Sequence, residues 1–506
     1  MTDPVAAAAS SRRRLDRAAL RERAIAALTT DELASIVDLV TWVETVDGEV
    51  VAHAANRHGR VRLRPGGQHE VLEGADPIPS EDPMAFLPYA AEVANPSPRD
   101  SRDNSYPYAA ERILSLFADP DRSPDLAIVH TPRHYFPDEG GHHGEHGSLD
   151  VIQSRAPLIL SGAGVARRGF VGDHARLVDV GPTLAVLAGA SADALVDAEG
   201  AALDGAPLTA YLTGESPRAV VGILWDGGHC GDLLHLAEQG ALPNVARLIE
   251  RGVALRGGAV AQFPSITLTN HTSILTGVGP GRHGVLGNVY FDRATGQQVV
   301  PNDETTWHRS AEWLRPGVRT VFELVDGMTA SVNEAIDRGA TYSTMGLIRA
   351  SAGESGAGAL GDQLPPAEAS PFLGDPRFIE DPYFRWGVSV DDLGLQQMRQ
   401  LYAGGLDTAP RLAWWANVVT DAGHHGAGPR SEMARDAFRQ SDARLGVFLG
   451  DLARMGVLDE VAFVLTADHG FEGADESVTG SWRGALESLG VPFRDEGPGF
   501  VYFLDA

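Results

Sequence analysis

Two apolar runs that end in metal-binding residue types constrain the fold of this chain most strongly. Residues 219–225 and 461–466 are hydrophobic almost throughout, and they are followed by Asp226 and by the pair Asp468-His469. Such runs are typical of strands buried on both faces of a parallel sheet, and amphipathic segments such as residues 242–252 lie between them. The pattern predicts an α/β fold with a mainly parallel central sheet and helices on both faces. Ligands bind at the carboxyl edge of such sheets, so we expect Asp468 and His469 there.

Two further segments carry candidate chemistry. Phe-Pro-Ser-Ile-Thr-Leu-Thr-Asn-His contains Thr267, and Asp421-Ala-Gly-His-His425 combines a carboxylate with imidazoles. Carboxylate oxygen and imidazole nitrogen are the usual zinc ligands, and two metals can clamp the attacking and leaving oxygens of an in-line displacement. Each residue alone has an ordinary explanation, since an Asp at a strand end is often a cap and Thr or Asn often caps a helix. The combination favours a two-metal phosphoryl-transfer site.

In their order, these segments resemble the alkaline phosphatase superfamily, and within it the nucleotide pyrophosphatase/phosphodiesterase branch. Thr267-Leu-Thr-Asn-His corresponds to the nucleophile segment of that branch, and Asn288 lies at the spacing of its phosphate-binding Asn. Asp421 to Pro429 corresponds to the motif Asp-x-x-Gly-His-x-x-Gly-Pro, and residues 468–470 correspond to Asp-His-Gly. The resemblance implies an alkaline phosphatase-like sandwich.

The resemblance also implies the metal ligands. Asp226, Thr267, Asp468 and His469 would hold one metal, and Asp421, His425 and one further His would hold the other. His424 occupies the place of the family glycine and is a rival of His425. Two Zn²⁺ are expected, with Mn²⁺ or Fe as alternatives for such N/O donors.

The further His is missing from its usual place, because the 36 residues after Gly470 contain no histidine. A segment that resembles the closing part of the family instead begins at His146 and continues through residues 156–164, 178–189 and 203–208. We therefore expect a circularly permuted chain with His146 as the remaining ligand. Without that continuation, the sequence does not choose among the five histidines of the region, which are His130, His134, His142, His143 and His146.

The permutation defines the expected domain organisation. One catalytic α/β domain is built from residues 1–215, normally the C-terminal segment, and residues 218–506, with 290–405 as a possible cap insertion. Residues 15–45 are expected to be helical and residues 49–73 to form a strand pair. Chain termini often lie close together, and the hypothesis requires residues 1 and 506 to be neighbours.

The resemblance implies hydrolysis of a phosphodiester or nucleotide pyrophosphate through a phosphothreonine on Thr267. Thr267 is expected near the N-terminus of a helix, which favours an anionic group, and Asn288 would donate a hydrogen bond to the phosphoryl oxygen. Leu268 occupies the usual base-stacking position, and Trp415 is a candidate stacking surface. Alternatives are a phosphonoacetate hydrolase-like C–P hydrolase, although the chain has no Lys to hold that substrate, a phosphomonoesterase, and a non-catalytic phosphate-binding pseudoenzyme.

Composition and charge limit the partners, the disulfide bonds and the cellular location that we expect for this chain. The formal net charge of −27 argues against nucleic-acid and anionic-membrane partners, so the expected partner is a small-molecule phosphoester. Cys230 is the only cysteine and excludes an internal disulfide. The start of the sequence has no signal-peptide pattern and no run is long enough to span a membrane, so a cytoplasmic location is expected. The oligomeric state is not readable from the sequence.

Overall fold

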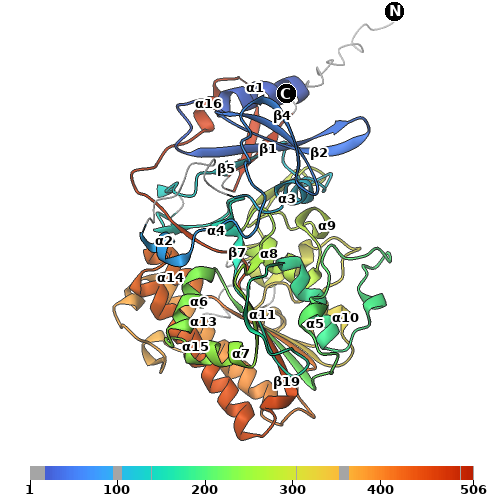
Figure 1. The fold of residues 1–506 in the computed structure, drawn as a ribbon, viewed down its shortest axis with the longest axis vertical. Coiled ribbons are helices and arrows are strands. Elements are labelled where there is room, and N and C mark those ends of the chain that lie inside the picture. The colour runs from blue at the N-terminus through green and yellow to red at the C-terminus, as the bar shows by residue number, and fades with distance from the viewer. Residues whose placement is uncertain are drawn as a thin grey trace, which may run out of the picture.

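A computed structural model describes residues 17–94, 105–137, 140–303, 305–352, 364–490, 492–497 and 499–504. A mixed α/β part forms the lower portion of the molecule and an antiparallel sheet forms the upper portion (Figure 1). The mixed sheet has the order β17 (Tyr342–Ser343), β16 (Thr329–Val332), β18 (Leu412–Asn417), β11 (Ala219–Trp225), β19 (Val461–Thr466), β8 (Leu158–Gly162), β12 (Gly252–Leu255) and β9 (Gly169–Val171).

Most neighbouring strands of the mixed sheet run parallel, as the sequence predicted. The pairs of β8 with β19 and with β12 are antiparallel, whereas the pairs from β17 to β19 and the pair of β12 with β9 are parallel. The register aligns Trp225 with Asn417 and Leu224 with Thr466. The carboxyl ends of three central strands therefore meet at one edge.

The central strand β11 buries alternate side chains on opposite faces of the sheet. Val221 and Ile223 pack with α6 (Cys230–Glu238), α7 (Pro243–Glu250), α13 (Pro382–Tyr402) and α15 (Glu432–Arg454). Val220 and Leu224 pack with α5 (Val180–Leu187) and α8 (Thr267–Thr276) on the other side. Full burial of a Val, Ile or Leu side chain contributes about 1.5–3 kcal/mol, so helices on both faces stabilise this strand.

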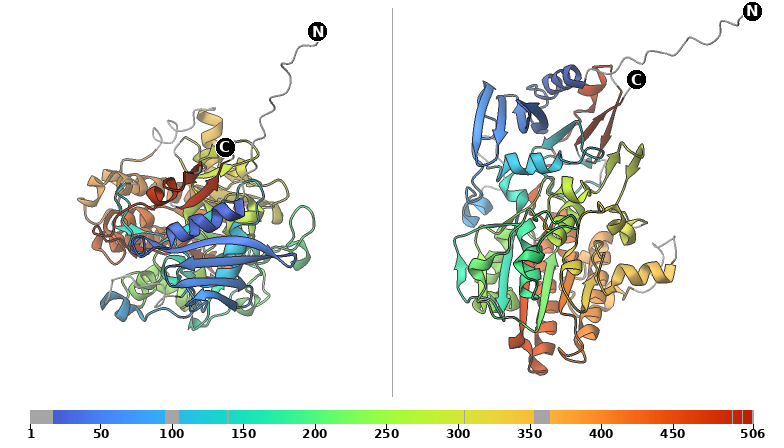
Figure 2. Two further views of the ribbon diagram at one scale, coloured as in Figure 1. Left: turned by 90° about the horizontal axis from the view of Figure 1, so that it is seen from above. Right: turned by 90° about the vertical axis from the view of Figure 1, so that its right-hand side faces the viewer.

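The upper sheet is built from both ends of the chain, as Figure 2 shows from two sides. Every neighbouring pair in it is antiparallel. Its order is β21 (Phe493–Glu496), β22 (Phe500–Phe503), β5 (Leu126–His130), β1 (Val37–Val46), β2 (Glu49–Asn56), β3 (Gly59–Arg64) and β4 (Gln68–Gly74). Helices α1 (Arg17–Leu28) and α3 (Ala109–Leu116) pack against it.

The structure corrects two expectations for the N-terminal part. The helix expected over residues 15–45 ends at Leu28, and Val37–Val46 forms β1, because its β-branched and aromatic residues fit a pleated sheet better than a helix. The segment expected to form a strand pair forms three strands, β2, β3 and β4.

The described ends of the chain lie together. The guanidinium of Arg17 donates to the carboxylate of Asp125 at 2.9 Å, and the backbone amide of Phe503 donates to the same carboxylate at 2.7 Å. Residues 1 and 506, whose proximity the permutation requires, lie outside the described residues.

Residues 290–405 differ from the expected cap in one respect. They contribute β16 and β17 to the edge of the mixed sheet, and α13 packs against the sheet. A large share of this segment is therefore part of the core. Among the described helices, none has the length and apolar character needed to cross a membrane.

Candidate metal centre

The first group of possible metal ligands lies where β11 and β19 end. Asp226 follows β11, and Asp468 and His469 follow β19. One ligand atom from each of the three lies within 4.8 Å of the others. The Nε2 atom of His469 is 3.2 Å from a carboxylate oxygen of Asp468 and 3.8 Å from one of Asp226. The parallel register of the two strands brings these residues together.

The second group joins a helix to a distant loop. Asp421 and His425 lie one turn apart on α14 (Val419–Ala427), with the His425 Nε2 atom 3.5 Å from an Asp421 oxygen. His146 follows the short strand β6 (Gly144–Glu145), and its Nε2 atom lies 3.3 Å from that of His425. Ligand atoms of His146, Asp421 and His425 all lie within 4.8 Å of one another.

Backbone carbonyls orient the imidazoles of the second group. The Nδ1 atom of His425 lies 2.9 Å from the Gly144 oxygen, and the Nδ1 atom of His146 lies 3.0 Å from the Ser265 oxygen. A proton on Nδ1 donates to the carbonyl and leaves Nε2 with a free lone pair directed at the site. The His146 ring also stacks on the His469 ring at 3.7 Å between centroids, so the two groups form one site.

A cation fits this set of possible ligands, because several of their buried polar atoms have no hydrogen-bond partner among the described residues. These are Asp226 Oδ1, Asp421 Oδ1, Asp468 Oδ2 and His469 Nε2. Burying an unpaired carboxylate is unfavourable, and buried charges are normally paired or bound to metals. The three carboxylates and three imidazoles suit zinc or another first-row divalent ion.

The titration behaviour of the groups agrees with this assignment. Burial, followed by repulsion from Asp468 and Asp421, raises the pKa of Asp226 to about 8. Burial also raises the pKa of Asp468 to about 6. Burial lowers the pKa values of His146, His425 and His469, which keeps these imidazoles neutral and able to bind a metal.

The structure distinguishes the rival histidines by position. The Nδ1 atom of His424 contacts the Thr420 oxygen at 2.6 Å, and its ring packs between Phe438 and Phe471, outside both groups. His142 and Glu145 form a third group with His425, within the same 4.8 Å limit. Among the described residues, His130, His134 and His143 belong to none of these groups.

Thr267 is the first residue of α8 and is half-buried. The residue before the helix is Ile266, which provides no side-chain cap, and the Asn270 side chain binds the Gln262 amide and two carbonyls instead. Asn288 accepts a hydrogen bond from the Leu268 amide at 3.2 Å. Asn288 therefore lies against the first turn of the helix that carries Thr267.

Two proposed substrate contacts need correction. The Leu268 side chain is fully buried in the core on one face of the sheet, and Trp415 is 1% exposed in the core on the other face. Trp415 lies within β18 and Leu268 within α8, where packing against neighbouring elements covers both side chains. Neither can stack on a substrate.

Sequence reasoning missed two residues beside the ligands. His271, one turn after Thr267, has its Nδ1 atom 2.9 Å from Glu334 and its Nε2 atom 3.5 Å from an Asp226 oxygen. Tyr383 of α13 donates its hydroxyl to Asp421 at 2.7 Å. His271 was visible next to Asn270 in the nucleophile segment, whereas no sequence motif marked Tyr383.

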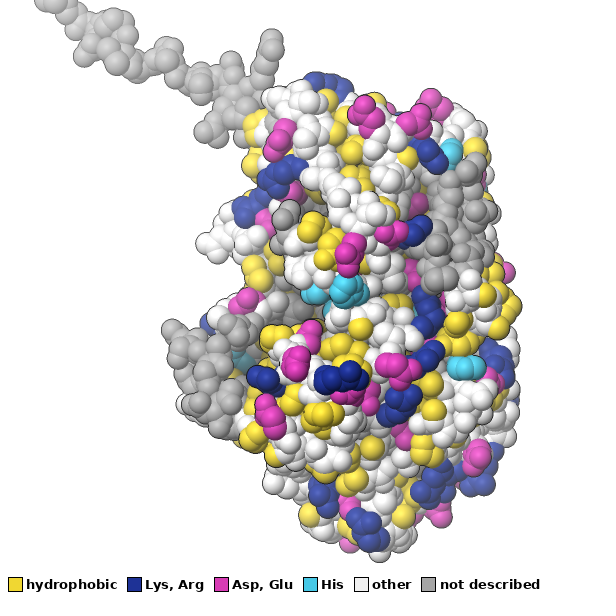
Figure 3. Space-filling model, turned by 90° about the vertical axis from the view of Figure 1, so that its left-hand side faces the viewer, with side chains coloured by type: hydrophobic (Ala, Val, Ile, Leu, Met, Phe, Trp, Pro, Cys, Tyr) yellow, Lys and Arg dark blue, Asp and Glu magenta, His cyan; other side chains and the backbone are white. Residues whose placement is uncertain are grey.

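Histidine side chains also gather at the surface near the middle of the molecule, with acidic side chains around them (Figure 3).

A cavity of about 290 Å³ lies beside the second ligand group, lined in part by His142, His146, Asn288 and His425.

Comparison with known proteins finds a family model that matches a little more than half of the chain. The family model described as Type I phosphodiesterase / nucleotide pyrophosphatase matches residues 220–490. That range contains every predicted metal ligand except His146.

Two curated proteins match shorter stretches. A 99-residue stretch is 36% identical to an uncharacterized pyrophosphatase/phosphodiesterase of Schizosaccharomyces pombe and covers 18% of this chain and 20% of that protein. A 90-residue stretch is 31% identical to the alkaline phosphatase PafA of Elizabethkingia meningoseptica and covers 18% of this chain and 16% of that protein. The chain thus spans a fifth or less of the length of these relatives.

Two solved structures resemble half of the chain. Murine ectonucleotide pyrophosphatase / phosphodiesterase 5 has 18% identity and a TM-score of 0.35, and it aligns over 50% of this chain and 57% of its own. Phosphonoacetate hydrolase from Sinorhizobium meliloti, in complex with phosphonoformate, has 21% identity and a TM-score of 0.33 over the same shares.

Proposed function

Because the chain belongs to the Type I phosphodiesterase / nucleotide pyrophosphatase family, we propose that it is a two-metal phosphodiesterase with Thr267 as its nucleophile. The observation that carries this proposal is the convergence of two ligand groups at one sheet edge. Substrates would be small-molecule phosphodiesters or nucleotide pyrophosphates.

The residues divide between two metal positions. Asp226, Asp468, His469 and the Thr267 hydroxyl would hold one ion, and His146, Asp421 and His425 the other. Zn²⁺ is the first candidate, with Mn²⁺ or Fe as alternatives. When bound, the two ions would favour the alkoxide form of Thr267 and stabilise charge on the leaving oxygen.

The side chains then perform a two-step displacement. The Thr267 oxygen attacks phosphorus, the bond to the leaving oxygen breaks, and the phosphoryl group remains as a phosphothreonine. Water then attacks phosphorus, breaks the bond to Thr267 and releases the product. Asn288 accepts from the Leu268 amide through its oxygen, so its NH₂ group is available to donate to a non-bridging phosphoryl oxygen. The N-terminus of α8 adds a favourable potential for the anion.

We also propose that the chain is a circular permutation of the family order. Two contacts of the N-terminal half support it. His146 lies beside Asp421 and His425, and β8 from the same half lies inside the mixed sheet between β19 and β12. The loop at residues 213–216 that would join the usual end to the usual start is exposed.

Hydrolysis of three substrates tests the proposed activity. Bis-p-nitrophenyl phosphate, p-nitrophenyl phosphate and phosphonoacetate are each offered to the zinc-loaded protein and to Thr267→Ala. We expect a preference for the diester and a loss of about 10³-fold or more in kcat in the variant, as for other removed nucleophiles. Acid-quenched protein should carry phosphate on Thr267 by mass spectrometry.

Thr276→Ala is the matched control, because Thr276 lies at the far end of the same helix and donates only to the Thr272 carbonyl. It should retain the wild-type rate. A preference for the monoester or for phosphonoacetate would assign another reaction, and absence of all three activities with metal bound would support a phosphate-binding pseudoenzyme.

A further inference from the structure

The cavity beside the metal centre lies between the two sheets. Its lower wall includes the proposed ligands His146 and His425, together with Asn288. Its upper wall includes Ile128 of β5 and Phe500 of β22, which are neighbouring strands of the antiparallel sheet. A group attached to a phosphate at the metal centre can therefore extend toward the sheet that the two chain ends build.

The lining of this cavity is largely apolar and aromatic. Phe136, Phe263, Pro264 and Ile266 contribute to it alongside Ile128 and Phe500. None of the described residues that line it is an arginine, and the sequence contains no lysine. A ligand in the cavity thus meets no guanidinium or ammonium group from the part of the chain that the structure describes.

The histidines in the lining do not supply a free cation. His130 accepts a hydrogen bond from the Trp482 indole at 3.1 Å, and His134 contacts the Gly480 carbonyl at 3.1 Å. Burial lowers the pKa of His130 to about 3 and also lowers that of His134, so both rings are neutral near pH 7. His142 is paired with the Glu145 carboxylate at 3.4 Å.

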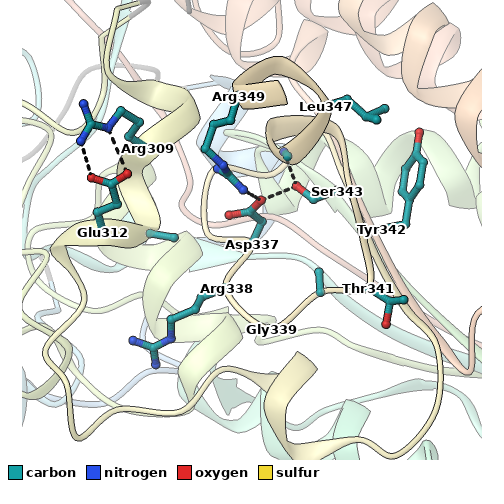
Figure 4. A pocket seen from close by; sticks show the side chains of 13 residues that line it. Arg309, Glu312, Asp337, Arg338, Gly339, Thr341, Tyr342, Ser343, Leu347 and Arg349 are labelled. Atoms are coloured by element: carbon teal, nitrogen blue, oxygen red, sulfur yellow. Dashed lines mark hydrogen bonds and ion pairs between the residues drawn. The ribbon is translucent and has the colours of Figure 1, made fainter. Parts of the chain in front are cut away.

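A second cavity shows the opposite lining. It has a volume of about 500 Å³ and is lined by Arg309, Arg338 and Arg349, with acidic partners beside them (Figure 4). Arg309 pairs with Glu312 at 2.7 Å and Arg338 pairs with Glu323 at 3.1 Å. The fold can place arginines in a cavity, yet none of the described residues that line the cavity at the metal centre is an arginine.

We propose that the cavity at the metal centre binds one uncharged, aryl-sized ester group of a phosphodiester and excludes ester groups that carry a carboxylate or further phosphates. This inference rests on the proposed function. An apolar lining stabilises an aromatic group by burial and ring contacts, whereas a buried anion without a cationic partner is unfavourable.

Two symmetric diesters test the inference. Because the two aryl groups of each diester are identical, the same group enters the cavity in either binding orientation. Bis(4-nitrophenyl) phosphate carries uncharged groups, and bis(4-carboxyphenyl) phosphate carries a carboxylate on each ring. The ratio of kcat/KM for the first to the second is measured for the wild type and for Phe136→Arg. We expect the variant to lower this ratio about tenfold or more, the size of one close charge pair.

Two further variants keep the result interpretable. Thr131→Arg places a cation on another part of the lining and should shift the ratio in the same direction. Leu347→Arg adds the same charge at the other cavity, on a side chain that is 51% exposed, and should leave the ratio unchanged. This control separates a local effect from the change in net charge.

Binding without turnover provides a second readout. Calorimetric titration of the Thr267→Ala protein should give a Kd for diphenyl phosphate about tenfold or more below that for bis(4-carboxyphenyl) phosphate. Equal Kd values for the two diesters would overturn the inference. The inference would also fail if the kcat/KM ratios of Phe136→Arg and Thr131→Arg equalled the ratio of Leu347→Arg. A wild-type protein that hydrolyses no diester would instead contradict the proposed function.

Discussion

The Nε2 atoms of His146 and His425 lie 3.3 Å apart, although the two residues are 279 positions apart in the sequence. Both imidazoles are held by backbone carbonyls that leave Nε2 directed at the site. Residues 1–215 thus supply a side chain to the site that residues 218–506 otherwise build.

His146→Ala should remove one metal ion per chain, because it deletes one of the three donors of the second group. The metal content after dialysis is measured by elemental analysis, and hydrolysis of the diester should fall with it. His143→Ala is the matched control, since His143 is exposed and belongs to none of the three ligand groups among the described residues. Unchanged metal content in His146→Ala would reject the assignment.

A relinked chain tests the permutation. Residue 506 is joined to residue 1, and new termini are opened between residues 215 and 216, in the exposed loop. Arg17 and Phe503 both bind Asp125, so we expect the join to be tolerated, with wild-type metal content and activity. An insoluble or metal-free product would count against this view of the chain order.

The metal-free protein should lose stability as the pH rises. Burial, with repulsion from Asp468 and Asp421, raises the pKa of Asp226 to about 8, whereas the unfolded value is about 3.9. Between these values the folded state binds more protons than the unfolded state, so the free energy of unfolding falls with increasing pH, by up to about 1.4 kcal/mol per pH unit.

Denaturant titrations of metal-free protein between about pH 7.5 and about pH 8.5 check this slope, because an unfolded-state imidazole with a pKa of about 6.5 is largely neutral there. Hydrogen bonds to Asp76 and Glu81 raise the pKa of His69 to about 9, so His69 adds a slope of the same sign, and the wild type is compared with Asp226→Asn. Asp226→Asn should have a shallower slope than the wild type, because the amide does not titrate. Equal slopes for the wild type and Asp226→Asn would show that Asp226 is ionised in the metal-free fold.

Tyr383→Phe should weaken the second metal without removing a ligand. The Tyr383 hydroxyl donates to Asp421, and loss of such supporting hydrogen bonds typically costs about 10–100-fold in metal affinity or activity. Competition with a chelator measures the affinity. Tyr342→Phe, a half-buried tyrosine on β17, is the control, and an affinity equal to that control would assign Tyr383 no role at the metal.

The sequence alone was sufficient to predict the mixed sheet and the grouping of most of the candidate metal ligands. Asp226, Asp468 and His469 could be predicted because each follows an apolar strand, and parallel strands bring their carboxyl ends to one edge. The i, i+4 spacing of Asp421 and His425 places both on one face of α14 in the same way. These relationships follow from the geometry of single strands and helices.

Only the tertiary structure shows which side chains face the site and which are buried away from it. The family motif favoured His425 over His424, and the continuation of the chain favoured His146 over His142, but only the tertiary structure shows which of these rings face the other candidate ligands across the site. Trp415 and Leu268 resembled substrate contacts in the sequence but are covered by elements that pack from distant segments. The position of Tyr383 beside Asp421 and the cavity between the two sheets likewise depend on contacts between segments far apart in the chain. The short-range periodicity of a sequence does not encode such long-range packing.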